Sequence, residues 1–383
     1  MSAVAASAAR VPVLYLLDLL RPGVGVPETL RFLIEPVRAA GFELHVGALH
    51  REPGDLGDEL AARAVPLLDL AASGFASTLR RMARTGLYLR RHRIALIHAN
   101  EYRAIHLALR LAQFAPRLRV VGHLRVTGNV RSSSGRRERW LARHARRMSE
   151  LVAVSQAVLD DFRDATGLRD FGRVIWNGRP LVRFERAADP AERERTRRSL
   201  GIAEGVPLLI CAATLQPSKD HPTLLRAAAR LKQEGVAFTL LLAGEGPARG
   251  ELEALAASLD LAPQVRLLGR RDDVPQLLSC ADLYVSASLR EGLPGSVIEA
   301  QASGLPCVVT RCGGPEEVVV DGESGLVVPP SDPAALSSAL ATLLRDAPLR
   351  SRMAAAARAN ARRFDLDRTV AAWSEVYRAA LSS

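Results

Sequence analysis

Short apolar runs alternate with helical patterns along the first half of this chain of 383 residues. Helical stretches such as Glu28–Ala40 and Ser77–Arg91 separate six runs with the composition of strands, which are Val11–Leu17, Glu43–Gly47, Ala95–Ala99, Arg119–Leu124, Leu151–Ser155 and Arg173–Trp176. Continuously apolar strands that alternate with helices are typical of a parallel, doubly wound sheet. We therefore predict an α/β fold in which ligands bind at the carboxyl ends of the strands.

The length and composition of the chain favour two such domains. A chain of 383 residues exceeds what one hydrophobic core usually serves, and 48% of its residues are hydrophobic. The polar and charged stretch Pro180–Ser199 predicts a linker followed by a helix. A second series of elements then begins with the predicted strand Pro207–Ala213 and a helix from about Pro222.

A strand–loop–helix turn in the second series carries the strongest chemical signal. The apolar run Ala281–Ser288 leads into a loop whose glycines allow the backbone to approach a ligand closely. Pro294 suits the first position of the following helix, and the free N–H groups of a first helical turn bind anions. Of the two carboxylates in this turn, Glu299 is placed to hold ribose hydroxyls, whereas Glu291 faces the group beyond the phosphates. This arrangement suits a sugar nucleotide.

The turn and its surroundings resemble the signature of glycosyltransferase family 4, including its E-x7-E motif. The resemblance rests on Ser288-Leu289-Arg290-Glu291-Gly292-Leu293-Pro294, Glu299-Ala300, Gly304-Leu305-Pro306 and Gly313-Gly314-Pro315-Glu316-Glu317. It implies the GT-B fold, in which two Rossmann-like domains face each other across a cleft. Residues 1–180 would bind the acceptor, residues 186–363 would bind a nucleotide-sugar donor, and a C-terminal helix over 366–383 would cross back to the first domain. The resemblance also implies transfer with retention of anomeric configuration.

The same resemblance implies the residues of the donor site. Its implied catalytic residues are Glu291, His123 and Lys219, and its donor-binding loop comprises Gly292, Leu293, Pro294, Gly295 and Ser296, with Glu299 on the ribose. The family places an arginine and a lysine five residues apart on the diphosphate. Here Lys219 is present, but Thr214 stands in place of the arginine. The segment Gly269–Val274 resembles the loop that contacts the nucleobase, through backbone atoms near Arg271.

The first half contributes a glycine-rich loop and polar residues at strand ends. In the family, two adjacent glycines after the first strand close over the phosphates and the acceptor. Here Val24 separates Gly23 from Gly25, so this loop departs from the family's pattern. For His98 we favour a hydrogen-bonded role at the end of its strand. His123 matches the histidine that contacts the donor sugar in the family. Arg125, two residues further on, would point to the same side and neutralise a phosphate or an acidic acceptor.

Charge is distributed unevenly along the chain. Residues 1–185 contain 29 arginines against 17 acidic residues, so the whole net charge of +11 comes from this half. Two interpretations remain open for its arginine-rich segments, 80–93 and 131–147: solvated helix faces, or peripheral attachment to an anionic membrane surface. We expect no nucleic-acid partner, because aromatic residues make up only 4% and no binding motif accompanies the charge.

The sequence offers weak signals for other ligands. Asp365-Leu366-Asp367 matches the D-x-D pattern of metal-dependent glycosyltransferases, but it precedes a predicted helix over Val370–Leu381, where Asp365 suits the N-cap. We therefore expect no metal and no other cofactor. The glycines of Ala243–Gly250 do not have dinucleotide-binding spacing. Four cysteines without metal-ligand spacing predict reduced thiols in a cytoplasmic protein. The apolar segment after Arg10 faintly resembles a signal peptide, although a first strand explains it better.

The sequence thus predicts a retaining glycosyltransferase that acts on a UDP- or GDP-sugar, with a glycan or lipid-linked acceptor. We expect this acceptor to be a lipid-linked intermediate or an intermediate of polysaccharide or lipopolysaccharide synthesis. A nucleotide-sugar epimerase or hydrolase with the same donor site is one alternative. A non-catalytic nucleotide-sugar-binding protein is another, which Thr214 and the separated glycines favour.

Overall fold

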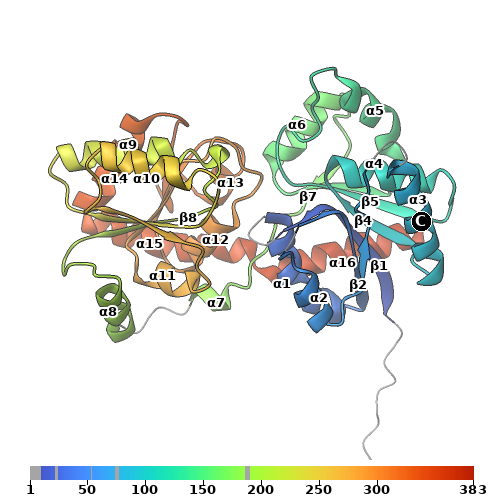
Figure 1. Cartoon of the computed structure of the whole chain (residues 1–383), viewed down its shortest axis with the longest axis horizontal. Helices are drawn as coiled ribbons and strands as arrows, with labels where there is room; N and C mark the ends of the chain where they lie inside the picture. The colour runs from blue at the N-terminus through green and yellow to red at the C-terminus, as the bar shows by residue number, and fades with distance from the viewer. Residues whose placement is uncertain (1–9, 22–24, 53, 74–76, 186–189) are drawn as a thin grey trace, which may run out of the picture. The chain divides into compact units, whose positions relative to one another are not determined.

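The computed structural model describes residues 10–21, 25–52, 54–73, 77–185 and 190–383. The chain divides into two compact units, one of residues 1–178 with 366–383 and the other of residues 179–365. Each unit contains one parallel sheet with helices on both of its faces (Figure 1). The predicted fold class, two Rossmann-like doubly wound sheets, is confirmed.

The sheet of the first unit has seven parallel strands in the order β3-β2-β1-β4-β5-β6-β7. Their bounds are β1 Val11–Leu20, β2 Phe42–Arg51, β3 Leu67–Asp69, β4 Leu96–Asn100, β5 Arg119–Leu124, β6 Glu150–Ala153 and β7 Arg173–Val174. The helices of this unit are α1 Gly25–Ala39, α2 Gly57–Ala62, α3 Ser77–Arg91, α4 Glu101–Ala112, α5 Arg136–His144, α6 Gln156–Thr166 and α16 Leu366–Ser382, with a 3-10 turn at Ala145–Arg147.

The C-terminal helix α16 belongs to the core of the first unit. It packs beside α1 and against β4 and β5. Trp373 and Tyr377, both fully buried, join the apolar side chains of β1, β2 and α1 in one cluster. Residues from the two ends of the chain therefore form this core together.

The sheet of the second unit has six parallel strands in the order β10-β9-β8-β11-β12-β13. Their bounds are β8 Leu208–Ala212, β9 Thr239–Ala243, β10 Val265–Gly269, β11 Leu283–Ser286, β12 Cys307–Thr310 and β13 Gly325–Val328. The helices are α7 Val182–Glu185, α8 Pro190–Ser199, α9 His221–Gln233, α10 Arg249–Ser258, α11 Val274–Cys280, α12 Gly295–Ala302, α13 Pro315–Val318, α14 Pro333–Arg345 and α15 Ala347–Ala361. Two 3-10 turns cover Pro217–Lys219 and Arg362–Phe364.

Several predicted bounds were wrong for identifiable reasons. Strand β1 continues to Leu20, because its pairing with β2 extends to that residue and the Asp18 carboxylate lies 2.9 Å from His50 Nδ1. The last helix, Leu366–Ser382, begins four residues before the predicted helical stretch Val370–Leu381, at the start of the predicted segment 366–383. Pro294 is not the first residue of α12: its backbone is extended (φ −75°, ψ 108°), and the helix starts at Gly295.

The cysteines agree with their predicted reduced state. All four are free thiols, of which Cys211, Cys280 and Cys307 are buried. Burial raises their pKa values, to about 12 for Cys211.

Candidate functional site

The strand order of the second unit brings two predicted site residues together. The chain leaves β8 toward β9 on one side and returns to β11 on the other, so the carboxyl ends of β8 and β11 form a topological switch point. Lys219 ends the 3-10 turn after β8, and Glu291 lies in the loop after β11. The Leu289 N–H donates to the Ser218 carbonyl at 2.9 Å, which joins the two loops.

At this switch point the Lys219 ammonium contacts Oε1 of Glu291. The hydroxyl of Ser288 donates to the same oxygen at 2.8 Å. Both partners of the pair are largely shielded, with 23% and 13% of their side-chain surfaces exposed. These contacts therefore hold the Glu291 carboxylate in one position and place the Lys219 ammonium beside the loop that precedes α12.

Helix α12 begins directly beside this pair. Its first intrahelical hydrogen bond runs from the Val297 N–H to the Pro294 carbonyl, at 3.2 Å. The N–H groups of Gly295 and Ser296 precede that bond, as expected for a helix start that can bind an anion. The Ser296 hydroxyl also accepts a hydrogen bond from Tyr284, at 2.8 Å.

An arginine that the sequence did not single out stands beside Glu299. Arg179 Nε donates to Oε1 of Glu299 at 2.8 Å, and the arginine is buried. Gly295 makes this possible, because a Cβ there would lie 1.7 Å from Nη2 of Arg179. Arg179 and Glu299 are separated by 120 residues. The signal for Arg179 was limited to its place beside residue 180, the predicted end of the first domain.

The loops around the pair pack backbone against backbone. A Cβ on Gly244 would lie 1.8 Å from the Ala213 carbonyl oxygen, and one on Gly314 would lie 2.2 Å from that of Gly292. The Glu316 carboxylate accepts hydrogen bonds from the N–H groups of Cys312 and Gly313, at 3.2 and 3.0 Å. The glycines thus allow the loops after β8, β9, β11 and β12 to converge at one edge of the sheet.

Two other residues that were predicted to bind the sugar-nucleotide donor lie on neighbouring loops. Thr214 is half-buried in the turn after β8, where its carbonyl accepts a hydrogen bond from the Gln216 N–H at 2.9 Å. Arg271 lies in the loop after β10, and its guanidinium group pairs with Asp273 at 2.8 Å. This pairing raises the pKa of Arg271 and lowers that of Asp273.

The first unit has a second group of polar residues at its own switch point, between β1 and β4. Glu101 begins α4 with a left-handed backbone (φ 68°), which is uncommon for a residue with a Cβ. Its Oε1 accepts the Arg125 N–H at 2.9 Å, whereas its buried Oε2 has no partner among the described residues. Burial raises the pKa of the Glu101 carboxyl to about 8. Sequence reasoning missed this residue.

The predicted residues Arg125 and His123 have different partners. Arg125 is buried, and its guanidinium donates to Thr29 Oγ1 on α1 at 2.8 Å and to the Tyr15 hydroxyl at 3.4 Å. His123 Nδ1 lies 3.0 Å from Nε2 of His98, whose Nδ1 lies 2.7 Å from the Tyr377 hydroxyl. Burial, and then the charge of Arg125, hold the pKa values of both histidines well below their usual range.

The glycine loop is only partly described. Gly23 lies outside the described residues. Gly25 is the first residue of α1, and its carbonyl accepts a hydrogen bond from Thr29 at 2.8 Å.

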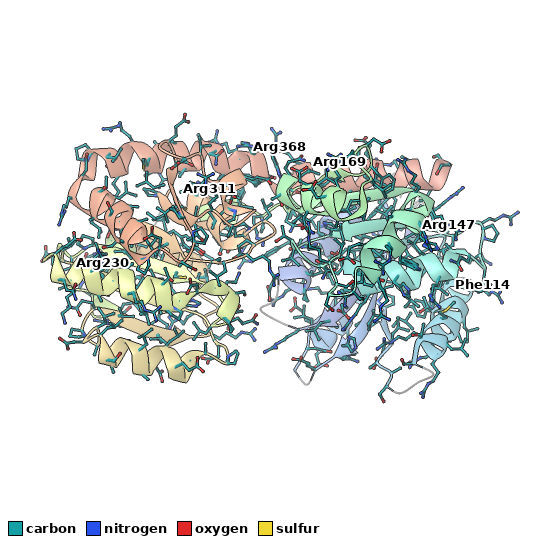
Figure 2. The ribbon with its side chains drawn as sticks, turned by 90° about the horizontal axis from the view of Figure 1, so that it is seen from above. Phe114, Arg147, Arg169, Arg230, Arg311 and Arg368 are labelled. Atoms are coloured by element: carbon teal, nitrogen blue, oxygen red, sulfur yellow. The ribbon has the colours of Figure 1, made fainter. Side chains whose placement is uncertain are left out.

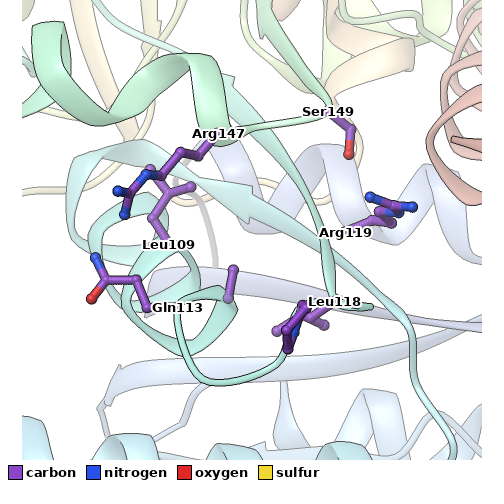
Figure 3. A pocket seen from close by; sticks show the side chains of 8 residues that line it. Leu109, Gln113, Leu118, Arg119, Arg147 and Ser149 are labelled. Atoms are coloured by element: carbon purple, nitrogen blue, oxygen red, sulfur yellow. The ribbon is translucent and has the colours of Figure 1, made fainter.

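A hollow of about 550 Å³ lies elsewhere in the first unit (Figure 3). Its lining includes Arg119, at the start of β5, and Ser149, just before β6. These are the amino ends of the strands, so the hollow is at the opposite edge of the sheet from His123.

Comparison with known proteins identifies the family. The sequence profile of the group "Glycosyl transferases group 1" matches residues 192–360, and that of "Glycosyltransferase Family 4" matches residues 25–183. The chain is a member of glycosyltransferase family 4. Its two parallel-sheet units are those of the GT-B fold.

Similar proteins include enzymes and a solved complex. The chain is 37% identical over 224 residues to a D-inositol 3-phosphate glycosyltransferase of Salinispora arenicola, covering 55% of this chain and 50% of that enzyme. It is 33% identical over 219 residues to a GDP-mannose-dependent monoacylated alpha-(1-6)-phosphatidylinositol monomannoside mannosyltransferase of Corynebacterium glutamicum, covering 55% and 56%. The chain thus spans about half the length of these relatives. Anabaena HepE in complex with UDP-glucose is 25% identical, with a TM-score of 0.83 over 96% of this chain and 99% of HepE.

Within the described ranges, no cluster of three His, Cys, Asp or Glu side chains could hold a metal ion. The described helices include none that is both long and apolar enough to span a bilayer.

Proposed function

We propose that this protein transfers a glycosyl group from a UDP- or GDP-sugar to a hydroxyl group of an acceptor, with retention of configuration at the anomeric carbon. The observation that supports this most is the Lys219–Glu291 pair beside the first turn of α12, at the switch point of the second sheet. In the reaction, the bond between the anomeric carbon and the diphosphate oxygen breaks. A bond from that carbon to the acceptor oxygen forms, the proton of the acceptor hydroxyl passes to the departing diphosphate, and UDP or GDP is released.

In this proposal the leaving diphosphate is stabilised by Lys219 and by the N–H groups of Gly295 and Ser296. An ammonium group has three donors, so the contact with Glu291 leaves capacity for phosphate oxygens. Preorganised donors aimed at developing negative charge commonly supply the largest catalytic contribution. We give Glu291 a role in positioning the sugar and stabilising charge.

The proposed contacts with the nucleoside of the donor involve residues near the Lys219–Glu291 pair. We propose that Glu299, oriented by Arg179, binds the ribose hydroxyls, and that the backbone near Arg271 contacts the nucleobase. The HepE complex with UDP-glucose supports a UDP-sugar, and the mannosyltransferase supports GDP-mannose as the alternative. The assignment of His123 to the donor sugar rests on the resemblance to the family.

We propose that transfer requires no bound metal ion, because a side-chain cation and helix-start N–H groups can neutralise the diphosphate. Activity should then persist in excess EDTA. Complete loss of activity that Mg²⁺ or Mn²⁺ restores would reject this proposal and make Asp365 and Asp367 the next residues to test.

The acceptor is proposed to be a glycan, a lipid-linked intermediate or a phosphorylated polyol, reached at the cytoplasmic face of a membrane. The acceptors in the names of the two enzyme relatives support this class. Helix α3 supports membrane contact, because Leu79 and Leu87 are 70% and 71% exposed on it. Arg80, Arg84, Arg90 and Arg91 of the same helix are exposed as well. Leucines flanked by arginines suit an anionic lipid surface.

Steady-state kinetics with UDP-glucose and GDP-mannose tests the donor site. Glu299→Ala should mainly raise the donor KM, because it removes a binding contact, whereas Glu291→Ala should mainly lower kcat. Equal and mild effects of both changes would reject the division of roles. A protein that only binds nucleotide sugars would bind either donor without releasing UDP or GDP, so nucleotide release separates that function from catalysis.

A further inference from the structure

Three side chains in the first unit form a continuous hydrogen-bonded chain that reaches His123. Tyr377 comes from α16, His98 from β4 and His123 from β5. The Tyr377 hydroxyl lies 2.7 Å from Nδ1 of His98, and Nε2 of His98 lies 3.0 Å from Nδ1 of His123. Nε2 of His123 is buried and has no partner among the described residues.

Packed rings fix the geometry of this chain. The indole ring of Trp373 lies 4.2 Å from the ring of His98 and 4.8 Å from that of His123, measured between centroids. Tyr15 covers His98 from a centroid distance of 4.5 Å. All of these side chains are buried. Rotation of either imidazole would therefore require the surrounding core to move.

The direction of the hydrogen bonds follows from the proton of Tyr377. Burial raises the pKa of this phenol well above its ordinary value, so the hydroxyl keeps its proton. Its one hydrogen-bond partner in the described part of the chain is His98 Nδ1, which must then accept. His98 therefore carries its proton on Nε2 and donates it to Nδ1 of His123. The reverse direction would leave a buried hydroxyl proton unpaired, at a cost of about 1–3 kcal/mol.

We propose that Tyr377 and His98 are positioning residues that hold His123 in the tautomer with its proton on Nε2, and that this N–H donates to a hydroxyl oxygen of the donor sugar. The contact with the sugar rests on the proposed function, whereas the tautomer does not. A neutral imidazole is consistent with the lowered pKa of His123. In this arrangement His123 supplies a fixed hydrogen-bond donor, so it is neither a general base nor a cation.

Nitrogen NMR of the ¹⁵N-histidine-labelled full chain tests the tautomer directly. The chain has eight histidines, so a His123→Gln variant identifies the resonances of His123. We expect the proton on Nε2 and a lone pair on Nδ1 at neutral pH. A proton on Nδ1 alone, or an imidazolium, would overturn the proposal.

A Tyr377→Phe variant tests the role of the hydroxyl with little change in shape. Without this hydroxyl, His123 should become a mixture of its two tautomers. The KM for UDP-glucose should then rise about two- to tenfold at similar kcat, in inverse proportion to the fraction of molecules that carry the His123 proton on Nε2. Tyr88→Phe is the matched control, because Tyr88 makes the same kind of contact with His45 Nδ1, at 2.9 Å, away from His123. An unchanged tautomer in Tyr377→Phe would overturn the positioning role.

Ligand titration tests the contact between His123 and the sugar separately from the tautomer of His123. UDP-glucose should shift the Nε2–H resonance of His123, whereas UDP alone should shift it little. An equal response to both ligands would overturn the sugar contact while leaving the tautomer assignment in place. Absence of binding by either UDP-glucose or UDP would instead count against the proposed function, and the NMR result on the tautomer would stand independently.

Discussion

Lys219 is one of two lysines in the chain, and its contact with Glu291 makes it the residue with the clearest expected effect. A charge-assisted hydrogen bond contributes about 1.5–3 kcal/mol. Lys219→Ala should therefore lower kcat/KM by roughly ten- to 150-fold, because the leaving diphosphate loses a cation. Steady-state kinetics with a nucleotide sugar measures the effect.

The other lysine provides the control. Lys232 lies 2.6 Å from the exposed carboxylate of Asp260, and Lys232→Ala should leave kcat/KM unchanged. Adding Thr214→Arg to Lys219→Ala should restore part of the lost activity, since it returns a cation to the position where the family has one. An unimpaired Lys219→Ala enzyme would show that the diphosphate binds elsewhere.

Glu101 should make stability depend on pH. Its carboxyl has a pKa of about 8 in the folded protein against an ordinary value of 4.5, so the folded state retains a proton that the unfolded state loses. Stability should therefore fall as pH rises from about 4.5 to about 8, by at most about 1.4 kcal/mol per pH unit. Glu101→Gln mimics the protonated acid. The free energy of unfolding of this variant, relative to that of the unmodified protein, should therefore increase over this pH range and level off above it.

Urea unfolding midpoints at pH 5, 6.5 and 8 measure that dependence. Glu251→Gln is the control, because Glu251 is exposed on α10 and the change alters net charge equally. If the unfolding midpoints of Glu101→Gln and Glu251→Gln change with pH in the same way, the Glu101 carboxyl is ionised in the folded protein.

Sequence reasoning could name some site residues but not their partners. Lys219 and Glu291 were predicted through the family motif, and yet their contact across 72 residues depends on β8 lying beside β11. The pairing of Arg179 with Glu299 depends on the absence of a side chain at Gly295. Glu101 had no signal, because its raised pKa arises from burial in the folded unit.

At the scale of elements, the contact between Arg179 and Glu299 of α12 depends on Gly295. A methyl group there would displace the guanidinium of Arg179 and break its 2.8 Å contact with Glu299. Because that guanidinium is buried and paired with Glu299, Gly295→Ala should also lower Tm. Affinity for UDP should fall roughly tenfold or more, since Glu299 loses the group that orients it. Calorimetric titration with UDP measures this loss.

Gly250 is the matched position in a helix without such a neighbour. An added Cβ there has no atom within 4 Å, and alanine is favoured over glycine inside helices by about 1 kcal/mol. Gly250→Ala should therefore raise Tm or leave it unchanged, with normal affinity for UDP. UDP binding by Gly295→Ala that equals that of the unmodified protein would contradict the role given to Arg179.

Periodicity predicted long elements better than short ones. Helix α3 has its predicted bounds, Ser77–Arg91, because its ends coincide with a change in pattern. Strand β3 was missed, since Leu67-Leu68-Asp69 is too short to establish a pattern and is defined by its pairing with β2. The order of the strands, which determines both switch points, has no signature in local sequence.

At the scale of the whole molecule, the net positive charge and most of the exposed large apolar side chains occur in the same half of the chain. Residues 1–185 contain the arginine excess, and they also contain Leu79, Leu87 and Phe114, the last of which is 78% exposed. Figure 2 marks Phe114 and Arg147 on the surface of the first unit. Helix α3, which carries the two leucines, packs beside α4, and Phe114 follows α4 directly.

Sedimentation with lipid vesicles tests whether this surface binds a membrane. Binding to anionic vesicles should weaken steeply with added salt, and neutral vesicles should bind little. The double change Leu79→Ser and Leu87→Ser should reduce binding without lowering Tm, because both side chains are exposed. Val182→Ser is the control, since Val182 is 69% exposed on α7 of the second unit. Equal binding to anionic and neutral vesicles, or none to either, would assign the arginines of the first half to solvation alone.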